Sequence, residues 1–312
     1  MSLLFVASMA ILLGLGLLLV REFRRPLAAE GSHWKKRLRI SLVAIPLLLG
    51  CLAFWAFLIE PNRLVIHHET IAIDMWPKEL DGLKIAVISD LHVGGSFIDL
   101  KKVRLIVERT NQLQPDMIVI LGDYMSGQGW TSNRVDPAVF AGVLKDLHAP
   151  FSVYSVLGNH DWWWNGPRVR DGLETNGIRV LEDEVLEVKV RGRSVWLAGL
   201  ADLWTRPQHI DETIAKIPPG AAVIALTHNP DIFPQLPQRV QLLLAGHTHG
   251  GQVRLPIVGT IIQPSNYGER YVRGHVFEKN HHLFVTTGIG TSIIPVRLGV
   301  PPEIVLLTIK TQ

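Results

Sequence analysis

The pattern of apolar and polar positions divides the chain into a membrane-type segment and a longer globular one. Two uncharged apolar runs, Met1 to Val20 and Ile40 to Ile59, each extend over 20 residues. At about 1.5 Å per residue, a helix of this length crosses the roughly 30 Å hydrocarbon core of a bilayer. We therefore predict a two-helix transmembrane hairpin in residues 1–60. The alternatives are a secretory signal for the first run and a buried core helix for the second, but no small-residue cleavage site ends the first.

Beyond residue 60, apolar runs of strand length alternate with helical periodicity. Strands are predicted at Leu83–Ser89, Met117–Leu121, Phe151–Leu157, Val195–Leu200, Ala222–Leu226 and Leu242–Ala245. Helical spacing marks Leu100 to Thr110 and Pro137 to Leu147. Continuous apolar strands that alternate with helices are typical of an α/β core whose strands are covered on both faces.

Further strand candidates favour a second sheet. They are an edge strand at Leu64–Ile73 and the closely spaced segments Val185–Val190, Gln252–Ile262, Tyr271–Val276, His282–Thr287 and Glu303–Ile309. Turn residues between the later segments indicate antiparallel pairing, so a two-sheet sandwich is predicted in place of a single sheet. The chain shows no interdomain linker, and residues 61–312 are predicted to form one domain.

A basic segment joins the two apolar runs. It carries Arg21, Arg24, Arg25, Lys35, Lys36, Arg37 and Arg39 against only Glu22 and Glu30. Short loops rich in Lys and Arg stay in the cytoplasm, which predicts a multi-pass protein of the inner (plasma) membrane with its globular domain outside the cytoplasm. This loop accounts for the excess of 31 basic over 28 acidic residues, so the basicity predicts no nucleic-acid partner. The single cysteine, Cys51, excludes an intrachain disulfide and a cysteine-based metal site.

Polar residues follow the points where five predicted strands end. They are Asp90 and His92, then Asp123, then Asn159, His160 and Asp161, then His228, and finally His247 and His249. Each motif alone is compatible with an ordinary turn or a structural histidine. Sites in open α/β sheets form at the carboxyl ends of the strands, so the five motifs together indicate one shared site.

These motifs resemble those of a known family. The segments DLH (90–92), GDY (122–124), GNHD (158–161), TH (227–228) and GHTHGGQ (246–252) are similar, in this order, to the calcineurin-like metallophosphoesterase superfamily. The segments GHTHGGQVRLP and GIGTSIIPVRLGVPPEI resemble its bacterial branch of membrane-associated phosphodiesterases. The resemblance covers about residues 80 to 310 and implies a four-layer α/β/β/α sandwich, in agreement with the predicted strands.

The resemblance also implies a site for two divalent metal ions. One ion would be held by Asp90, His92, Asp123 and His249, and the other by Asp123, Asn159, His228 and His247, with Asp123 bridging them. Mixed imidazole and oxygen ligands suit Mn, Fe or Zn better than Mg or Ca. Phosphoryl transfer needs charge neutralisation more than a protein nucleophile, so water activated by the metal pair is the expected nucleophile.

His160 is the expected catalytic side chain beside the metals. Its imidazole would protonate the leaving oxygen or stabilise negative charge on the reacting phosphate, and the alternative is a structural loop histidine. Asp161, also assigned to catalysis, is expected to fix the tautomer of His160.

Tryptophans near the motifs bear on the substrate. Trp162, Trp163 and Trp164 follow the third motif, and Trp130 and Trp204 lie in other loops. Tryptophan favours the membrane interface, so these rings form either a rim for lipid or part of a hydrophobic core.

Three functions follow from these observations. The leading one is two-metal-dependent hydrolysis of a phosphodiester or pyrophosphate bond in a lipid or envelope metabolite, with a UDP-2,3-diacylglucosamine-type pyrophosphatase as a specific candidate. A nucleotide-linked substrate is cytoplasmic, however, and the charge pattern places the domain outside. The alternatives are a broad-specificity phosphomonoesterase or nucleotidase and a non-catalytic membrane binding module. The expected partners are the membrane and a phosphate-containing small-molecule or lipid-linked substrate.

Overall fold

The computed structural model describes residues 14, 16–18, 21, 33–127 and 134–312. The chain divides into two compact units, Met1–Glu60 and Pro61–Gln312. Most of the first predicted span, Met1 to Val20, and most of the basic loop lie outside the described residues. The two-helix hairpin therefore stays a prediction.

The second predicted span forms a helix. Helix α2 (His33–Phe54) contains Pro46 and continues through a π-helical turn, η1 (Trp55–Ile59), and a 3₁₀ turn, η2 (Glu60–Asn62). Within the described residues, Ile40–Asn62 is the one helix long and apolar enough to cross a membrane, judged by length and composition. Large apolar side chains such as Leu42 and Leu48 are exposed along it, as lipid contact would require.

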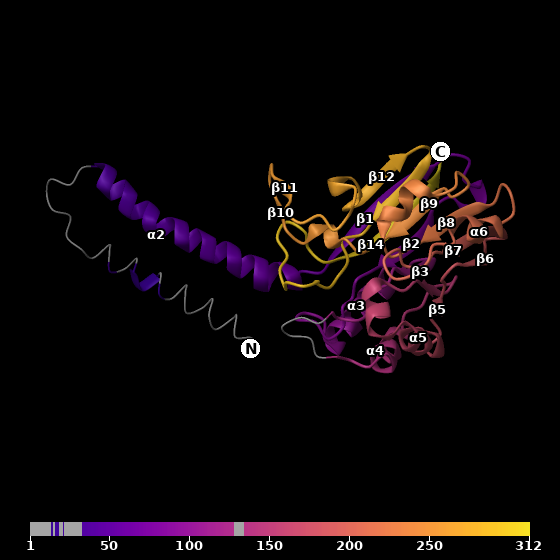
Figure 1. The fold of residues 1–312 in the computed structure, drawn as a ribbon, viewed down its shortest axis with the longest axis horizontal. Helices are drawn as coiled ribbons and strands as arrows, with labels where there is room; N and C mark the ends of the chain where they lie inside the picture. The colour runs from indigo at the N-terminus through magenta and orange to yellow at the C-terminus, as the bar shows by residue number, and fades with distance from the viewer. Residues whose placement is uncertain (1–13, 15, 19–20, 22–32, 128–133) are drawn as a thin grey trace. The chain divides into compact units, whose positions relative to one another are not determined.

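The larger unit is built around two six-stranded sheets (Figure 1). The first sheet has the order β1 (Val65–Ile73), β14 (Glu303–Thr311), β2 (Leu83–Ile88), β3 (Met117–Ile120), β4 (Val153–Ser155) and β5 (Arg179–Val180). Strands β2 to β5 are parallel, and β14 is antiparallel to β2 and parallel to β1. The predicted edge strand at Leu64–Ile73 is confirmed as β1.

The second sheet confirms the predicted sandwich. Its order is β12 (Gly274–Glu278), β13 (His281–Val285), β9 (Leu242–Ala245), β8 (Ala222–Leu226), β7 (Arg193–Gly199) and β6 (Glu184–Val190). The four inner strands are parallel, and β12 and β6 are antiparallel at the edges. The parallel inner strands end on the same side of the sheet, which brings the loops after β8 and β9 together.

Alternate residues of each strand enter different layers of core. In β2, Ile85 and Val87 pack between the two sheets, whereas Ala86 and Ile88 face the helices α3 (Leu100–Gln112), α4 (Pro137–Leu144) and α5 (Asn159–Thr175). In β8, Val223 and Ala225 face α6 (Ile210–Ala215) and the 3₁₀ segment η4 (Pro230–Gln235). Helices, two sheets and a second helical layer therefore give the α/β/β/α order (Figure 1).

Some predicted elements differ from the observed ones. The candidate strand Gln252–Ile262 contains only the small hairpin β10 (Arg254–Leu255) and β11 (Gly259–Thr260). The candidate Tyr271–Val276 was misplaced, because the 3₁₀ turn η6 (Gly268–Tyr271) ends there and β12 begins at Gly274. Helix α5 was missed because Gly166 and Pro167 interrupt its pattern, and the helix is indeed kinked at Asn165.

Candidate metal centre

The loops after β2, β3, β4, β8 and β9 meet at one edge of the sandwich. Two glycines allow their close approach. A Cβ at Gly158 would overlap the Asp123 carboxylate, and one at Gly246 would lie 2.7 Å from Asp90 Oδ2 and overlap Ser89. Only glycine permits these backbones to pass so near the two carboxylates.

Asp90, His92 and His249 form the first group of side chains in the site. The Nε2 atoms of His92 and His249 lie 3.0 Å apart, and His249 Nε2 lies 3.5 Å from Asp90 Oδ1. All three side chains are buried. One imidazole nitrogen from each histidine and one carboxylate oxygen are therefore placed within the reach of a single metal ion.

A second group surrounds Asp123. Its Oδ2 lies 3.2 Å from His228 Nε2 and 3.7 Å from His92 Nε2, which connects the second group to the first. His247 Nδ1 lies 3.3 Å from His228 Nε2. Asn159 lines the same cavity as Asp123 and His247. The structure thus brings together all seven residues that the motifs nominated as ligands.

Backbone carbonyls orient two of the imidazoles. His92 Nδ1 lies 3.0 Å from the carbonyl oxygen of Met125, and His228 Nδ1 lies 2.7 Å from that of Leu121. A carbonyl oxygen only accepts hydrogen bonds, so Nδ1 donates in both rings and Nε2 points to the site. This arrangement is how proteins commonly fix histidines that bind metals through Nε2.

The electrostatics of the site favour bound cations. Burial lowers the pKa of His92 to about 4 and that of His247 to about 3, so both rings are neutral at pH 7 and keep a lone pair for a metal. Burial alone would also lower the pKa of His228, but the carboxylates of Asp123 and Asp90 raise it to about 10. The two buried carboxylates therefore stabilise a positive charge between them, and a divalent cation meets that requirement.

Unpaired polar atoms in the site also fit metal ligation. Among the described residues, Asp90 Oδ1, Asn159 Oδ1 and His247 Nε2 are buried without a hydrogen-bond partner. A buried polar atom without a partner costs roughly 1–3 kcal/mol. All three atoms belong to nominated ligands, and each has a free lone pair, so the donor set fits divalent ions.

Backbone strain is concentrated in the same residues. The φ angle is positive at Asp90 (55°), His92 (46°), Asp123 (55°), His247 (71°) and His249 (50°). Side chains other than glycine rarely adopt this left-handed region. Such strain often accompanies sites where side chains must be held in one direction.

His160 lies at the edge of the site. Its Nε2 is 4.0 Å from Asp123 Oδ2, and its ring packs edge-on against His92 with 4.8 Å between centroids. His160 is the second residue of α5, and its backbone N–H donates to Asp123 Oδ1 at 2.9 Å. The imidazole is less buried than the nominated ligands and lines the cavity, where a substrate can reach it.

Asp161 does not hold His160 in the way the sequence suggested. Its carboxylate accepts hydrogen bonds from the backbone N–H groups of Asp123, Met125 and Gly158, at 2.9 to 3.0 Å. The prediction overlooked that a carboxylate in the first turn of a helix readily accepts from nearby backbone amides. Asp161 therefore joins the loops after β3 and β4, and it positions Asp123 instead of the His160 imidazole.

Above the metal cluster lies a cavity of about 260 Å³. Trp163 and Trp204 line it and are 61% and 51% exposed, with Trp204 edge-on to His247 at 4.3 Å. Trp162 and Trp164 instead pack against the core of helices α3 to α5. The core interpretation is confirmed for Trp162 and Trp164, contact of Trp163 and Trp204 with lipid stays a prediction, and Trp130 lies outside the described residues.

Sequence reasoning missed two buried residues that support the site. The Arg297 guanidinium donates to the carbonyl oxygens of Thr287, Gly288, Gly290 and Val300, and lies 3.5 Å from His249 Nδ1. The Asp202 carboxylate accepts from the backbone N–H groups of Trp204 and Thr205 and so holds the tryptophan loop. Asp202 lies two residues after the predicted strand Val195–Leu200, the same offset as Asp123 and Asn159 from their strands, so its position was a signal that went unused. Arg297 follows no predicted strand and gave no such signal.

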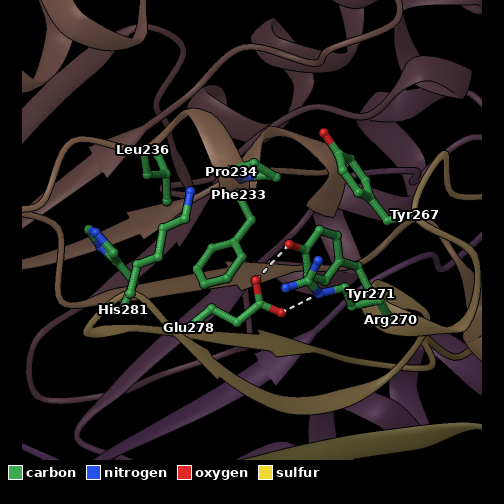
Figure 2. Close-up of a pocket in the computed structure, with 9 residues that line it drawn as sticks. Phe233, Pro234, Leu236, Tyr267, Arg270, Tyr271, Glu278 and His281 are labelled. Atoms are coloured by element: carbon green, nitrogen blue, oxygen red, sulfur yellow. Dashed lines mark hydrogen bonds and ion pairs between the residues drawn. The ribbon is translucent and has the colours of Figure 1, made fainter.

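A smaller pocket of about 120 Å³ lies apart from the metal cluster (Figure 2). Its walls include Phe233, Tyr267 and Tyr271. Glu278 accepts hydrogen bonds from Arg270 Nε at 2.5 Å and from the Tyr271 hydroxyl at 3.0 Å. Arg270 and Glu278 in Figure 2 are therefore paired with each other, as is expected for a structural ion pair.

Comparisons with known proteins agree with this geometry. The family model described as calcineurin-like phosphoesterase matches residues 83–251. The uncharacterized metallophosphoesterase YkuE of Bacillus subtilis is 31% identical over 260 residues, covering 82% of this chain and 89% of the relative. The phosphodiesterase YaeI of Escherichia coli is 29% identical and covers 72% of this chain and 81% of its own.

A third relative, from Danio rerio, is named a transmembrane protein with metallophosphoesterase domain. It is 30% identical over 77% of this chain, and the match spans 56% of the relative. With the family model covering all five motifs and a 31% identical relative aligned over most of its length, the chain belongs to the calcineurin-like phosphoesterase family and is a metal-dependent hydrolase of phosphoester bonds.

Proposed function

We propose that the chain is a two-metal phosphodiesterase or pyrophosphatase that acts on a lipid-linked or envelope metabolite. The observation that carries the proposal is the convergence on Asp123, because the Nε2 atoms of His228, His92 and His160 all lie within 4.0 Å of its Oδ2. Asp123 would bridge two ions. Asp90, His92 and His249 would complete one ligand set, and Asn159, His228 and His247 would complete the other.

The protein's own residues would divide the chemistry among them. A pair of bound Mn, Fe or Zn ions would activate water and neutralise the phosphate charge. The His160 imidazole would donate a proton to the leaving oxygen. Asp161 would keep Asp123 in place through the backbone, and the helix α5 N-terminus would stabilise negative charge beside His160.

The cavity supports an amphiphilic substrate. Its lining combines Asp123 and His247 with the apolar side chains of Ile262, Ile294 and Val296. A phosphate group would lie at the charged end and an acyl or prenyl chain at the apolar end. The relative YaeI is named a phosphodiesterase, which agrees with a diester substrate. UDP-2,3-diacylglucosamine is one candidate that combines a pyrophosphate with acyl chains.

The proposed location is the inner membrane, with both termini of a two-helix hairpin and the hydrolase outside the cytoplasm. The exposed apolar helix α2 and the Danio rerio relative's name support membrane attachment. The basic loop of residues 21–39 supports the orientation. Protease added to intact spheroplasts should then cleave residues 61–312, and protection of this unit would reverse the topology.

Two model substrates test the reaction. Purified full-length protein should bind a transition metal and hydrolyse bis-p-nitrophenyl phosphate faster than p-nitrophenyl phosphate after Mn²⁺ is added. Faster turnover of the monoester would favour the phosphomonoesterase or nucleotidase. The absence of both metal and turnover would favour a binding module. Mass spectrometry of lipid and nucleotide-linked extracts after incubation would then identify the substrate.

A further inference from the structure

Two exposed apolar turns stand beside the cavity, and we call them the apolar tips. The first comprises Ile257, Val258, Ile261 and Ile262 around the β10–β11 hairpin, and the second comprises Ile293 and Ile294. Ile257 and Ile293 are the most exposed of these side chains, at 108% and 89%. The other four are about half to two-thirds exposed. A contiguous group of this kind is typical of an interaction surface.

The backbone makes this exposure more unusual. Ile257 has a φ of 70° and Ile293 a φ of 62°. A β-branched side chain is a genuine outlier in the left-handed region, which glycine and asparagine adopt more readily. The turns therefore present isoleucine to the outside at the two positions where a soluble turn would favour a small or polar residue.

Gln252 ties the second tip to the metal centre, and the next residue, Val253, accepts a hydrogen bond from the Ile261 N–H of the first tip. The side-chain Nε2 of Gln252 donates to the carbonyl oxygens of Ser292, at 3.1 Å, and Ile294, at 3.3 Å. Its Oε1 accepts from the backbone N–H of Ser292 at 2.7 Å. Gln252 is three residues beyond His249, and its backbone N–H donates to the His249 carbonyl oxygen. The tips are thus held in place relative to the ligands.

Part of this apolar surface continues into the cavity. Ile262, Ile293 and Ile294 line it together with Asp123, His247 and His249. The remaining tip residues, Ile257, Val258 and Ile261, project outside it. An apolar path therefore leads from the exterior to the metal ligands.

We propose that the apolar tips insert into the surface of the lipid bilayer in which this chain is anchored. The candidate span ends at Asn62, and only Arg63 and Leu64 separate it from β1. At roughly 3.3–3.6 Å per residue, this linker keeps the start of the hydrolase unit close to the bilayer. Projecting isoleucines on two turns suit insertion among acyl chains and headgroups, where apolar side chains gain by leaving water. The inference goes beyond the proposed function, because docking requires no turnover.

Fluorescent probes at the tips test the inference in the full-length protein. Cys51 is replaced (Cys51→Ser), and single cysteines are introduced as Ile257→Cys or Ile293→Cys, labelled with an environment-sensitive dye and reconstituted into liposomes. The control is Glu212→Cys in α6, which lies far from the β10–β11 hairpin in the view of Figure 1. Nitroxide lipids should quench both tip probes at least about twofold and leave the control unchanged, as expected for shallow insertion.

Two results would overturn the inference. One is quenching of the tip probes no stronger than that of the control. The other is a blue-shifted tip probe that nitroxide lipids do not quench, since a protein partner or a second copy would then cover the tips.

A second variant tests cooperation between the tips. If both turns insert together, Ile293→Asn should reduce the quenching at position 257 to roughly half. Val139→Asn, which removes an exposed apolar side chain from α4, should not change it.

Because the probes report depth and not hydrolysis, they also separate the two proposals. Quenched probes in a protein without diesterase activity would support docking and reject the proposed function. Active protein with unquenched probes would support the proposed function and reject docking.

Discussion

The metal-centre loops and the apolar tips both hold residues other than glycine in the left-handed region, but their surroundings are opposite. Asp90, Asp123 and His249 are buried and make several contacts with neighbouring loops. Ile257 and Ile293 are almost fully exposed. In the first region, the contacts of the buried side chains offset the backbone strain. In the second, the side chains themselves contribute little to the folded unit.

The interaction that compensates for backbone strain differs between the two regions. Strain of about 1–2 kcal/mol per residue persists when something stabilises the strained state or when function selects it. At the ligands, backbone hydrogen bonds supply that stabilisation and bound cations would add to it. At the tips, the proposed membrane contact would supply it from outside the protein. Single substitutions that each remove one side chain's contribution to catalysis or stability distinguish the two regions.

Replacing Asp123 should have the largest effect. Asp123→Asn removes a charge shared by both proposed ligand sets, and we expect kcat/KM for bis-p-nitrophenyl phosphate to fall by about 10³-fold or more, since losing one preorganised charge-stabilising group typically costs about 10²–10³. Metal content, measured by mass spectrometry, should fall with it. Asp146→Asn, at an exposed position near α4, should change neither. Activity retained by Asp123→Asn would remove Asp123 from the mechanism.

Asp161 should contribute mainly to stability. Asp161→Ala leaves the buried N–H groups of Asp123, Met125 and Gly158 without their acceptor. Unsatisfied buried donors typically cost about 1–3 kcal/mol each, and we expect a loss of about 3 kcal/mol or more in the free energy of unfolding. Urea unfolding in detergent measures this change. A normal unfolding midpoint combined with a shifted pH–rate profile would instead restore the earlier assignment of Asp161 to His160.

His160 should affect turnover and leave the metals in place. His160→Gln removes the proposed proton donor, and general acid catalysis contributes about 10²–10⁴-fold. We expect kcat to fall by about 10²-fold, with less change for a substrate whose leaving group needs no proton. Metal content should equal that of the original protein. Because His160 Nε2 also lies within reach of an ion beside His92 and Asp123, a lost metal would identify it as a ligand.

The sequence predicted the nominated metal ligands better than the residues that hold them in place. Five strand ends were located within one or two residues in most cases, because β8 and β9 are short apolar runs bounded by clear turns. Since parallel strands end together, their polar residues were expected to converge. Arg297 could not be found this way, because its importance comes from carbonyl groups of residues 287–290 that the folded chain brings near. Asp202 follows a strand end as well, but its partners are the nearby amides of Trp204 and Thr205. Ile257 falls in the predicted strand Gln252–Ile262 and Ile293 in no predicted element, and their positive φ follows from turns that apolar periodicity does not encode.

A smaller effect concerns the His67–Glu303 pair, which supports the loop around Asp90. The contribution of this pair to the free energy of unfolding should depend on pH. His67 Nδ1 lies 3.0 Å from Glu303, and Glu303 also accepts from the Thr287 N–H. The hydrogen bond to Glu303 raises the pKa of His67. Burial would raise the pKa of Glu303, but hydrogen bonds from His67 and Thr287 lower it.

The signs define a pH window. Stability from a raised histidine pKa is complete below its ordinary value of 6.5 and is lost as the pH rises through the raised value. Stability from a lowered glutamate pKa is present above 4.5 and is lost as the pH falls through the lowered value. The difference in unfolding free energy between the original protein and His67→Gln should therefore be largest between about pH 4.5 and 6.5. His209→Gln, at the exposed pair with Glu212, should show a flatter difference.

The smallest expected change is a gain in the free energy of unfolding. Asparagine tolerates a positive φ better than isoleucine does, so Ile257→Asn and Ile293→Asn should each raise the free energy of unfolding by about 0.5–1 kcal/mol in detergent. Urea unfolding measures the gain, and Val139→Asn in α4, where φ is helical, should show none. A stabilised variant that docks less well on liposomes would mean that the native isoleucines lower stability in favour of membrane contact. A destabilised variant would mean that the tips pack within the protein after all, and the contrast with the metal-centre loops would fail.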